Sequence, residues 1–332
     1  SALSAAPKAR RPRKSSCSST RDGNSALLMP LHPLSGVYAA AVTPLYPDYS
    51  IDISAVPFLL DFLAKRGCHG AILFGTTGEG PSFAFQERVD LWREAVQIRK
   101  AHPHFKLIAG TGTPSLQETI ALTRAAFDLG LDAALVLPPY FFRKATDDGL
   151  FAWFAEVIKR AVPSGGALLG YHIPPVSDVA LSPDLLSRLK DSFPDRFAGV
   201  KDSSGDAEHG QLLGNRFGRD LLIFCGTDSL FTSALEAGAS GCITAPANLF
   251  SPLLRQVWEA HTQGGDTATP QSRLNAARAI SDRYPPASAM LKAMLARFHG
   301  FPRWPVRPPL LPLSREMEEK AVEEFSVNGL NG

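Results

Sequence analysis

Short runs of apolar, β-prone residues alternate along the chain with longer stretches in which apolar residues recur at helical spacing. The alternation begins near residue 36 and is regular to about residue 263. The short runs predict strands over 36–45, 71–79, 106–112, 133–139, 167–174, 197–204, 221–228 and 241–248. The longer stretches predict helices over 53–65, 84–100, 115–129, 149–161, 182–192, 207–216, 230–237 and 252–263.

Each strand–helix unit is about 30 residues long, apart from a shorter one at the end of the series. The strands are apolar along most of their length, which is typical of parallel strands covered on both faces. The alternative is a doubly wound open sheet, which favours a Gly-x-Gly-x-x-Gly turn after its first strand. The residues after Thr43 are Pro44, Leu45 and Tyr46, with no glycine. The pattern therefore predicts an α/β fold, a closed TIM (β/α)8 barrel over residues 35–263.

The chain changes character after residue 263. Two glycines at 264–265 are followed by helical stretches at 271–283, 286–298 and 314–325, and a Pro-rich segment at 302–312 separates the last two. We interpret residues 264–332 as a C-terminal helical extension packed on the barrel.

Composition and charge narrow the classes of partner. The 332 residues are 45% hydrophobic and 20% charged, with a formal net charge of +2, as in an ordinary soluble domain. Basic residues gather in the first 35 positions beside the single acid Asp22, so the rest of the chain is slightly acidic. This distribution excludes a broad basic face for nucleic acid. Residues 1–34 are rich in Ser, Ala, Arg and Pro, which predicts a disordered basic tail.

The cysteines and the lengths of the apolar runs bear on where the protein resides in the cell. The cysteines Cys17, Cys68, Cys225 and Cys242 lack metal-ligand spacing, which favours reduced thiols. No apolar run approaches the roughly 18 residues of a membrane span. We therefore expect a cytoplasmic protein with no membrane partner. The Arg- and Ser-rich tail also resembles an organelle transit peptide, and that alternative stays open.

The predicted strand ends carry polar residues where a barrel of this kind builds its active site. The second strand ends in Gly-Thr-Thr-Gly-Glu at 75–79, the fifth in Tyr171 and His172, and the sixth in Lys201 and Asp202. Tyr171 and Lys201 are 30 residues apart, which is one strand–helix unit. We therefore expect these two side chains to lie on neighbouring strands at the same height.

Side chains alternate along a strand, so residues 197, 199 and 201 are expected on one face. If Lys201 points into the barrel, Phe197 and Gly199 lie beneath it. His172 alternates with Tyr171 and is expected to face the helices in a structural role. Glu79 is likewise interpreted as structural, either through loop backbone groups or as a helix cap.

A lysine beside a tyrosine and glycine-flanked threonines suits imine chemistry. The amine attacks a ketone, and the protonated imine accepts the electrons of a neighbouring C–C bond as it breaks. A tyrosine can carry the protons, and the N–H groups of a Gly-Thr-Thr-Gly turn can hold a carboxylate. Each residue alone is more often structural: a lysine in solvent, a tyrosine in the core, a glycine-rich loop. Their joint placement at strand ends favours the chemical interpretation, which requires no metal or other cofactor.

At these residues the chain resembles the dihydrodipicolinate synthase / N-acetylneuraminate lyase family of class I pyruvate-dependent aldolases. The 75–79 run matches the family's G-[ST]-T-G-E loop, residues 171–174 its Y-N-x-P strand end, and residues 199–202 its G-x-K-[DE] strand. Gly-Thr-Asp at 226–228 and the glycines at 238 and 241 match later markers. The resemblance runs from about residue 36 to the C-terminal helices.

The resemblance implies a role for each matching residue. Lys201 would form the Schiff base with pyruvate or another 2-oxo acid, Tyr171 would move protons, and Thr76 would hydrogen-bond the tyrosine hydroxyl. Thr77 and the amides of the loop with Gly75 and Gly78 would hold the carboxylate of the 2-oxo acid, and the backbone of Ile243 would contribute to the same pocket. The family also implies a homotetramer built as a dimer of dimers.

Two departures from the family pattern bear on the second substrate. In dihydrodipicolinate synthases an arginine after Y-N-x-P binds the carboxylate of aspartate semialdehyde. Here Val176 occupies that position and Asp178 follows, so a carboxylate finds no positive partner. The family's relay tyrosine is replaced by Phe141, which has no hydroxyl.

The leading hypothesis is therefore a carbon–carbon lyase that reversibly joins or cleaves pyruvate and an aldehyde other than aspartate semialdehyde. Three alternatives remain: 4-hydroxy-tetrahydrodipicolinate synthesis for lysine production, dehydration of a keto-deoxy sugar acid, and a non-catalytic barrel that binds a 2-oxo acid.

Overall fold

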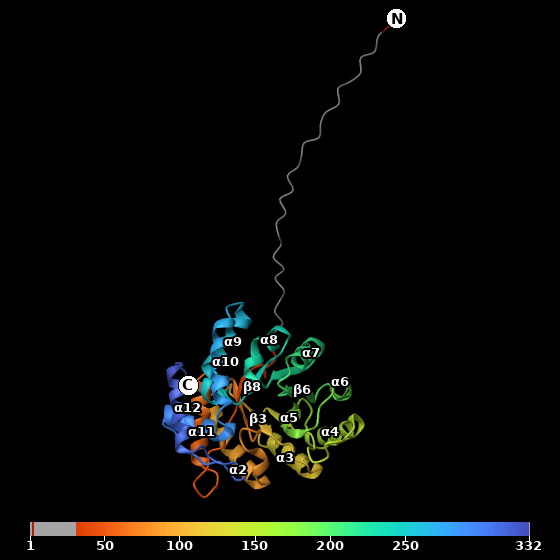
Figure 1. Ribbon diagram of the computed structural model, residues 1–332. Coiled ribbons are helices and arrows are strands. Elements are labelled where there is room, and N and C mark those ends of the chain that lie inside the picture. The colour runs from red at the N-terminus through yellow and green to blue at the C-terminus, as the bar shows by residue number, and fades with distance from the viewer. Residues whose placement is uncertain (1, 3–30, 332) are drawn as a thin grey trace. The chain divides into compact units, whose positions relative to one another are not determined.

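The computed structural model describes Ala2 and residues 31–331, and its ribbon is shown in Figure 1. The predicted tail, residues 1–34, falls almost wholly outside the described residues, as does Cys17. Residues from Pro33 onward form one compact unit that includes the C-terminal helices. Within it, eight parallel strands close into a barrel in sequence order, with β1 paired to both β2 and β8. The predicted TIM barrel is confirmed.

The strands are β1 (Gly36–Ala40), β2 (Gly70–Leu73), β3 (Lys106–Gly110), β4 (Ala133–Val136), β5 (Ala167–His172), β6 (Phe197–Asp202), β7 (Leu222–Cys225) and β8 (Gly241–Thr244). The helices among them are α1 (Val56–Lys65), α2 (Phe85–Ala95), α3 (Leu116–Asp128), α4 (Asp147–Ala161), α5 (Pro174–Ser177), α6 (Pro183–Ser192), α7 (Ala207–Phe217) and α8 (Phe231–Glu236). Short 3-10 turns are η1 (Ile53–Ala55), η2 (Gly80–Ser82), η3 (Val96–Lys100) and η4 (Asp228–Leu230). After β8 come α9 (Ala247–Gln263), α10 (Ala268–Ser281), α11 (Ala287–His299) and α12 (Arg315–Val327).

Local sequence signals account for five of the helix starts. A Ser, Thr or Asp side chain accepts a hydrogen bond from a first-turn backbone N–H in several helices, which satisfies a donor that the helix leaves unpaired. These caps are Ser115 in α3, Thr146 in α4, Ser182 in α6, Asp206 in α7 and Ser314 in α12. Helix α9 starts at Ala247 rather than at the predicted residue 252, because a kink at Phe250 lets the chain turn before Pro252.

Three apolar clusters hold the barrel. One fills its interior with alternate residues of the strands, among them Tyr38, Ile108, Tyr171, Phe224 and Ile243. The other two lie between the strands and the surrounding helices. In Figure 1 the strands lie in the middle, and the later helices α10, α11 and α12 gather beside α9. Among the described helices none is both long and apolar enough to span a membrane.

The expectation for the residues beneath Lys201 was wrong in one respect. The pairing of β5 with β6 shifts between Leu168 and Leu169, which face Phe197 and Gly199. Such a bulge adds one unpaired residue, here Ala198, and reverses the alternation before it. Phe197 therefore packs outward with the helices, while Ala198 packs against the interior cluster.

Candidate active site

Lys201 and Tyr171 are paired across neighbouring strands at the carboxyl end of the barrel. Their Cα atoms are register partners in β5 and β6, as the 30-residue spacing predicts. Both side chains are buried, at 5% exposure each. The Lys201 Nζ donates to the Tyr171 hydroxyl at 3.2 Å and lies 4.4 Å from the centre of its ring. A buried amine and a phenol are thus in direct contact.

Thr76 completes a short hydrogen-bonded chain. Its Oγ1 lies 3.2 Å from the Tyr171 hydroxyl, so the phenol oxygen is shared between the threonine and Lys201. Burial raises the pKa of Tyr171, but the charge of Lys201 and hydrogen bonds from Thr76, Lys201 and Ser203 outweigh it and lower the pKa below its usual value of 10. A phenol with a lowered pKa gives up its proton more readily, which suits an acid/base group.

Residues 75–79 form a tight loop, called here the 75–79 loop. Its close backbone contacts leave little room for a side chain at Gly78. The Thr43 Oγ1 donates to the carbonyl of Gly78 at 2.7 Å, and a Cβ on Gly78 would lie 2.7 Å from the carbonyl oxygen of Ala41. The turn is closed by Glu79 N donating to the carbonyl of Thr76 at 3.0 Å. Glycine is required at 78 because any side chain would meet the first strand.

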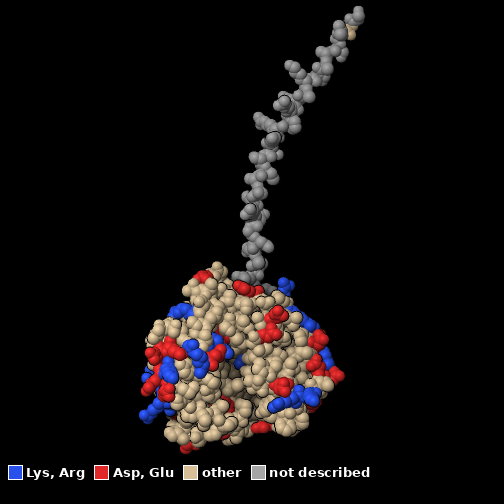
Figure 2. Space-filling view, in the orientation of Figure 1, with Lys and Arg blue, Asp and Glu red and all other residues tan. Residues whose placement is uncertain are grey.

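The outer edge of this loop is open to a ligand. Thr76 is exposed and Thr77 is half-buried. Within residues 31–331, the backbone N–H groups of Thr76 and Thr77 donate to no protein acceptor. Free amides in a tight turn form a concave site for an anion. The face shown in Figure 2 is hollowed near its middle, with acidic and basic side chains interspersed around it.

The structure places Ile243 in the same interior cluster as Tyr171, on β8 and fully buried. Gly75 lies at the end of β2, where an added Cβ would meet only the Ile72 side chain at 3.5 Å. By contrast, the nearby Thr111 points away, because its Oγ1 is 2.8 Å from that of Thr123 in α3. The third strand's Gly-Thr-Gly end thus contributes its threonine to helix packing.

Sequence reasoning missed several residues that shape the loop from behind. Arg88 is buried in α2 and donates to the carbonyls of Gly80, Phe83 and Gly110. Lys292 and Arg307 contact Glu79. Both lie in residues 264–332, called here the C-terminal part. Glu79 is structural, as expected, but its partners are neither loop amides nor a helix cap. No motif in the sequence marks Arg88, and Lys292 and Arg307 lie far from the loop along the chain.

The positions that depart from the family pattern lie on two exposed loops. Val176 is 64% exposed in the one-turn helix α5, and Asp178 follows it in a left-handed conformation with φ 55°. The Asp178 carboxylate lies 3.8 Å from the guanidinium of Arg143, which comes from the loop after β4. Phe141 on that loop is 74% exposed and packs edge-on against Phe142. Asp178 is therefore partly neutralised by a neighbour that the sequence pattern did not reveal.

His172 faces the helices as predicted. Its Nδ1 accepts from the backbone N–H of Leu181 at 3.0 Å, and its ring stacks on that of His209 at 4.6 Å. With Asp202 these histidines form a group of possible metal ligands whose atoms lie within 4.8 Å of one another. A metal lies in the plane of each imidazole that binds it. The two rings are only 26° from parallel, so their nitrogen lone pairs do not converge on one point.

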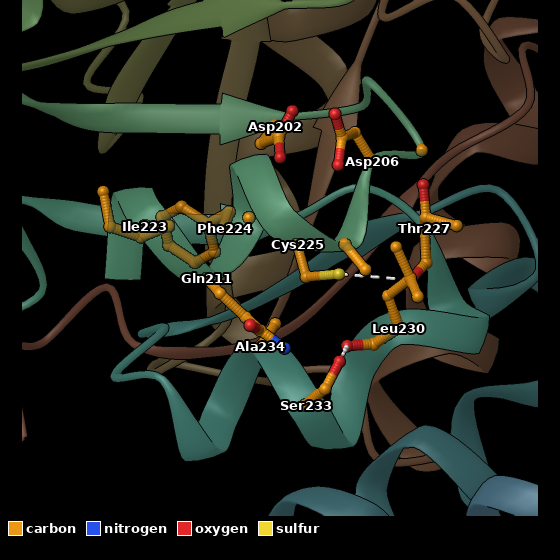
Figure 3. Close-up of a pocket in the computed structure, with 13 residues that line it drawn as sticks. Asp202, Asp206, Gln211, Ile223, Phe224, Cys225, Thr227, Leu230, Ser233 and Ala234 are labelled. Carbon is orange, nitrogen blue, oxygen red and sulfur yellow. Dashed lines mark hydrogen bonds between the residues drawn. The ribbon is translucent and has the colours of Figure 1, made fainter. Parts of the chain in front are cut away.

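A pocket lies on the outer side of β6 and β7 (Figure 3). The carboxylates of Asp202 and Asp206 lie on one side of it, and Cys225 and Thr227 on the other. Its lining includes both carboxylates but no lysine or arginine. Burial raises the pKa of Cys225 to about 12, so its thiol is not ionised near neutral pH. This pocket is unsuited to a 2-oxo acid anion.

Comparison with known proteins connects this geometry to one family. A sequence profile of the Dihydrodipicolinate synthetase family matches residues 33–327. An uncharacterized DapA-like lyase of Chloroflexus aurantiacus is 41% identical over 85% of this chain and 92% of its own length. A 4-hydroxy-tetrahydrodipicolinate synthase of Prochlorococcus marinus is 32% identical over 91% of this chain and 97% of its own.

Solved structures agree with the fold. The dihydrodipicolinate synthase of Agrobacterium tumefaciens superimposes with a TM-score of 0.79 at 30% identity, over 88% of this chain and 98% of that one. A catalytic lysine mutant of the Ruminococcus gnavus sialic acid aldolase gives a TM-score of 0.80 at 22% identity, over 89% and 96% of the two chains. The second likeness speaks for the fold alone.

Proposed function

Because the chain belongs to the dihydrodipicolinate synthetase family, as its match over residues 33–327 shows, we propose that Lys201 is the amine on which its reaction runs. The protein is a pyruvate-dependent carbon–carbon lyase of this family. The observation that carries the assignment of Lys201 is its direct contact with the Tyr171 hydroxyl, 3.2 Å away at the carboxyl end of the barrel.

The proposed reaction proceeds through an imine. The Lys201 amine adds to the C2 carbonyl of the 2-oxo acid, the carbonyl oxygen leaves as water, and a protonated imine remains. Loss of a proton from C3 gives an enamine, whose C3 bonds to the aldehyde carbon while the aldehyde oxygen takes up a proton. Water then hydrolyses the imine and frees Lys201. Cleavage is the same sequence in reverse.

The other residues have distinct tasks in this proposal. Tyr171 moves protons to and from the reacting atoms, and Thr76 holds its hydroxyl in place. The free amides of Thr76 and Thr77 bind the carboxylate, with Gly75 and Gly78 shaping the turn and Ile243 lining the pocket wall. The imine nitrogen accepts the electrons, so the reaction is proposed to need no cofactor. Activity is accordingly expected to survive prolonged dialysis against EDTA.

Borohydride reduction tests the proposal. Treatment with pyruvate and borohydride is expected to add a reduced adduct to Lys201, visible by peptide mass spectrometry. The adduct is expected to disappear in Lys201→Ala and to persist in Lys190→Ala, a surface lysine of α6 that pairs with Asp191. A wild-type protein that binds pyruvate and carries no adduct would instead support the non-catalytic, sensor-like barrel.

The aldehyde is proposed to lack a carboxylate at the position that an arginine recognises in dihydrodipicolinate synthases. Support comes from Val176, which is apolar, and from Asp178, whose exposed carboxylate is paired loosely with Arg143 at 3.8 Å. Turnover of pyruvate with aspartate semialdehyde is expected to be much slower than with neutral aldehydes, and Val176→Arg is expected to narrow the gap. Equal rates in the wild type would favour the alternative of 4-hydroxy-tetrahydrodipicolinate synthesis, the activity in the Prochlorococcus relative's name.

Assembly as a homotetramer, a dimer of dimers, and residence in the cytoplasm are also proposed. The exposed Phe141 and Phe142, at 74% and 64%, support the first, because adjacent exposed aromatic rings are typical of surfaces that become buried in an interface. Fractionation of cells that make the full chain tests the second.

A further inference from the structure

Glu79, the last residue of the 75–79 loop, connects this loop to the C-terminal part of the chain. Its side chain is fully buried, and its backbone is left-handed with φ 58°. One carboxylate oxygen accepts from the Lys292 Nζ at 2.5 Å, and the other accepts from the backbone N–H of Arg307 at 2.7 Å. A left-handed backbone is unfavourable for a residue other than glycine and persists only where its surroundings enforce it.

Lys292 is committed to this contact. It lies on α11 with its side chain fully buried, and it also donates to the carbonyl of Pro305 at 2.7 Å. A buried carboxylate without a cation is strongly disfavoured, so Glu79 stays in place only while Lys292 faces it. The lysine thus connects one helix of the C-terminal part both to the loop and to the segment that carries Arg307.

Arg307 fastens the same region by its side chain. Its guanidinium lies 4.1 Å from the ring centre of Phe83 and donates to the carbonyls of Ser82 and Tyr49 at 2.7 and 2.8 Å. It also pairs with Glu87 of α2 at 2.5 Å. These contacts hold residues 82–87, which follow the loop. The C-terminal part of the chain therefore contacts both the last residue of the loop and the segment after it.

The conformation enforced at Glu79 decides where the loop amides point. The Glu79 N–H donates to the carbonyl of Thr76 and the Gly80 N–H to that of Gly75, both at 3.0 Å, which closes the turn. The N–H groups of Thr76 and Thr77 are left without protein acceptors, and Thr76 reaches the Tyr171 hydroxyl. A rotation at Glu79 would redirect the free amides and separate Thr76 from Tyr171.

We propose that Lys292 and Arg307 are positioning residues for 2-oxo acid binding. Lys292 acts through Glu79, and the Arg307 side chain acts through Ser82, Phe83 and Glu87, so that together they hold the 75–79 loop with its free amides directed at the substrate carboxylate. This inference rests on the proposed function, because the loop binds the substrate only if Lys201 forms the imine. The C-terminal part is thereby a component of the substrate site as well as of the fold.

The test follows imine formation directly. Borohydride trapping of Lys201 is measured at increasing pyruvate concentration, at a temperature well below unfolding. In Lys292→Met the pyruvate concentration for half-maximal trapping is expected to rise about tenfold or more, since small misplacements of binding groups have large effects. The apparent KM for the aldehyde is expected to change much less, because the free amides of this loop are proposed to bind the carboxylate of the 2-oxo acid.

Two further variants keep the test decisive if Lys292→Met does not fold. Glu79→Gln combined with Lys292→Met removes both buried charges. Arg307→Leu removes the side-chain contacts to Ser82, Tyr49, Phe83 and Glu87 and keeps the backbone N–H contact to Glu79. Both variants are expected to raise the pyruvate concentration needed for trapping more than the KM for the aldehyde. Arg307→Lys is expected to fall between the wild type and Arg307→Leu, because lysine lacks the planar guanidinium group of arginine. The matched control is Arg278→Met, which breaks another contact between the C-terminal part and the barrel, Arg278 to Asp228 at 3.0 Å.

The outcomes separate the two hypotheses. The positioning proposal is supported if pyruvate half-saturation shifts in the loop variants and not in Arg278→Met. It is overturned if folded loop variants trap pyruvate at wild-type concentrations, or if Arg278→Met shifts the curve equally, which would indicate general loosening. Absence of trapping in the wild type would overturn the proposed function itself.

Discussion

The Tyr171 hydroxyl has two hydrogen-bond partners. Lys201 and Thr76 both contact it at 3.2 Å, and the side chain is 5% exposed. Within a buried site a hydrogen-bonded chain of this kind fixes both the position of the proton and the groups between which it moves. We test this chain by removing the Tyr171 hydroxyl and then the Thr76 hydroxyl.

Replacement of the tyrosine by phenylalanine removes the hydroxyl and keeps the ring. For Tyr171→Phe we expect kcat for aldol cleavage to fall by about 10²–10⁴-fold, the usual contribution of a positioned acid/base group. Pyruvate trapping on Lys201 is expected to continue, more slowly. Steady-state rates and trapping together measure this, and wild-type turnover in the variant would remove Tyr171 from the mechanism.

Removal of the Thr76 hydroxyl is expected to change the pH dependence of kcat/KM. The hydrogen bond from Thr76 lowers the pKa of Tyr171, so its loss in Thr76→Val lets that pKa rise. The form with a protonated phenol then persists to higher pH, and the alkaline limb of kcat/KM is expected to move upward. Thr111→Val, whose hydroxyl bonds Thr123 instead, is the control and should leave the limb in place.

The pairing of Lys201 with Tyr171 could be predicted from the sequence because parallel strands in a barrel repeat at one strand–helix length. The surroundings of Glu79 could not. Its partners Lys292 and Arg307 lie 213 and 228 residues further along the chain, and no periodicity connects positions so far apart. A carboxylate after a Gly-Thr-Thr-Gly turn is compatible with many partners, and only the packed chain selects one.

At the scale of elements, β6 carries the lysine and depends on a close approach to β7. A Cβ on Gly199 would lie 2.0 Å from the carbonyl oxygen of Leu222, which is backbone and cannot rotate away. We expect Gly199→Ala to destabilise the fold by about 1–3 kcal/mol or more, by overpacking. Gly149→Ala in α4 is the matched control, with its nearest contact at 3.6 Å, and is expected to stabilise by about 0.5–1 kcal/mol. Urea unfolding midpoints compare the two.

The strand β5 carries a buried histidine with an acid-sensitive environment. Burial lowers the pKa of His172 to about 4, the neighbouring Asp202 opposes the shift, and His209 adds to it. The unfolded chain binds this proton near pH 6.5 and the folded chain does not, so stability from this group is lost as the pH falls from about 6.5 towards 4. In His172→Asn we expect a smaller loss of thermal stability between pH 7 and 4.5, with His104→Asn unchanged from wild type.

The strands and helices were largely predictable because their apolar periods are long and regular. The bulge at Ala198 was not, since a single unpaired residue leaves no mark in a short apolar run. It reversed the expected direction of Phe197, while Lys201 beyond it kept the predicted pairing. The one-turn helix α5 was also absent from the pattern, because four residues are too few to show a helical period.

At the scale of the whole molecule, Phe141 is 74% exposed, at the position that the sequence resemblance assigns to the family's relay tyrosine. If this ring is buried between subunits, as the tetramer proposal requires, a charge there disfavours association. We expect Phe141→Glu to shift sedimentation velocity profiles towards dimers or monomers at micromolar concentration. Arg124→Glu on α3, an exposed polar position, is the control. A single monomeric species in the wild type would contradict the tetramer.

The long reach from Glu79 to Arg307 also has a consequence for how the protein is made. The ribosome delivers the loop early, and the partners that set its shape emerge more than two hundred residues later. All eight strands, with Tyr171 and Lys201, leave the ribosome before Lys292 does. The strands of a nascent chain can therefore be present while the 75–79 loop still lacks Lys292 and Arg307, and we expect pyruvate binding to begin only after residue 307 has been made.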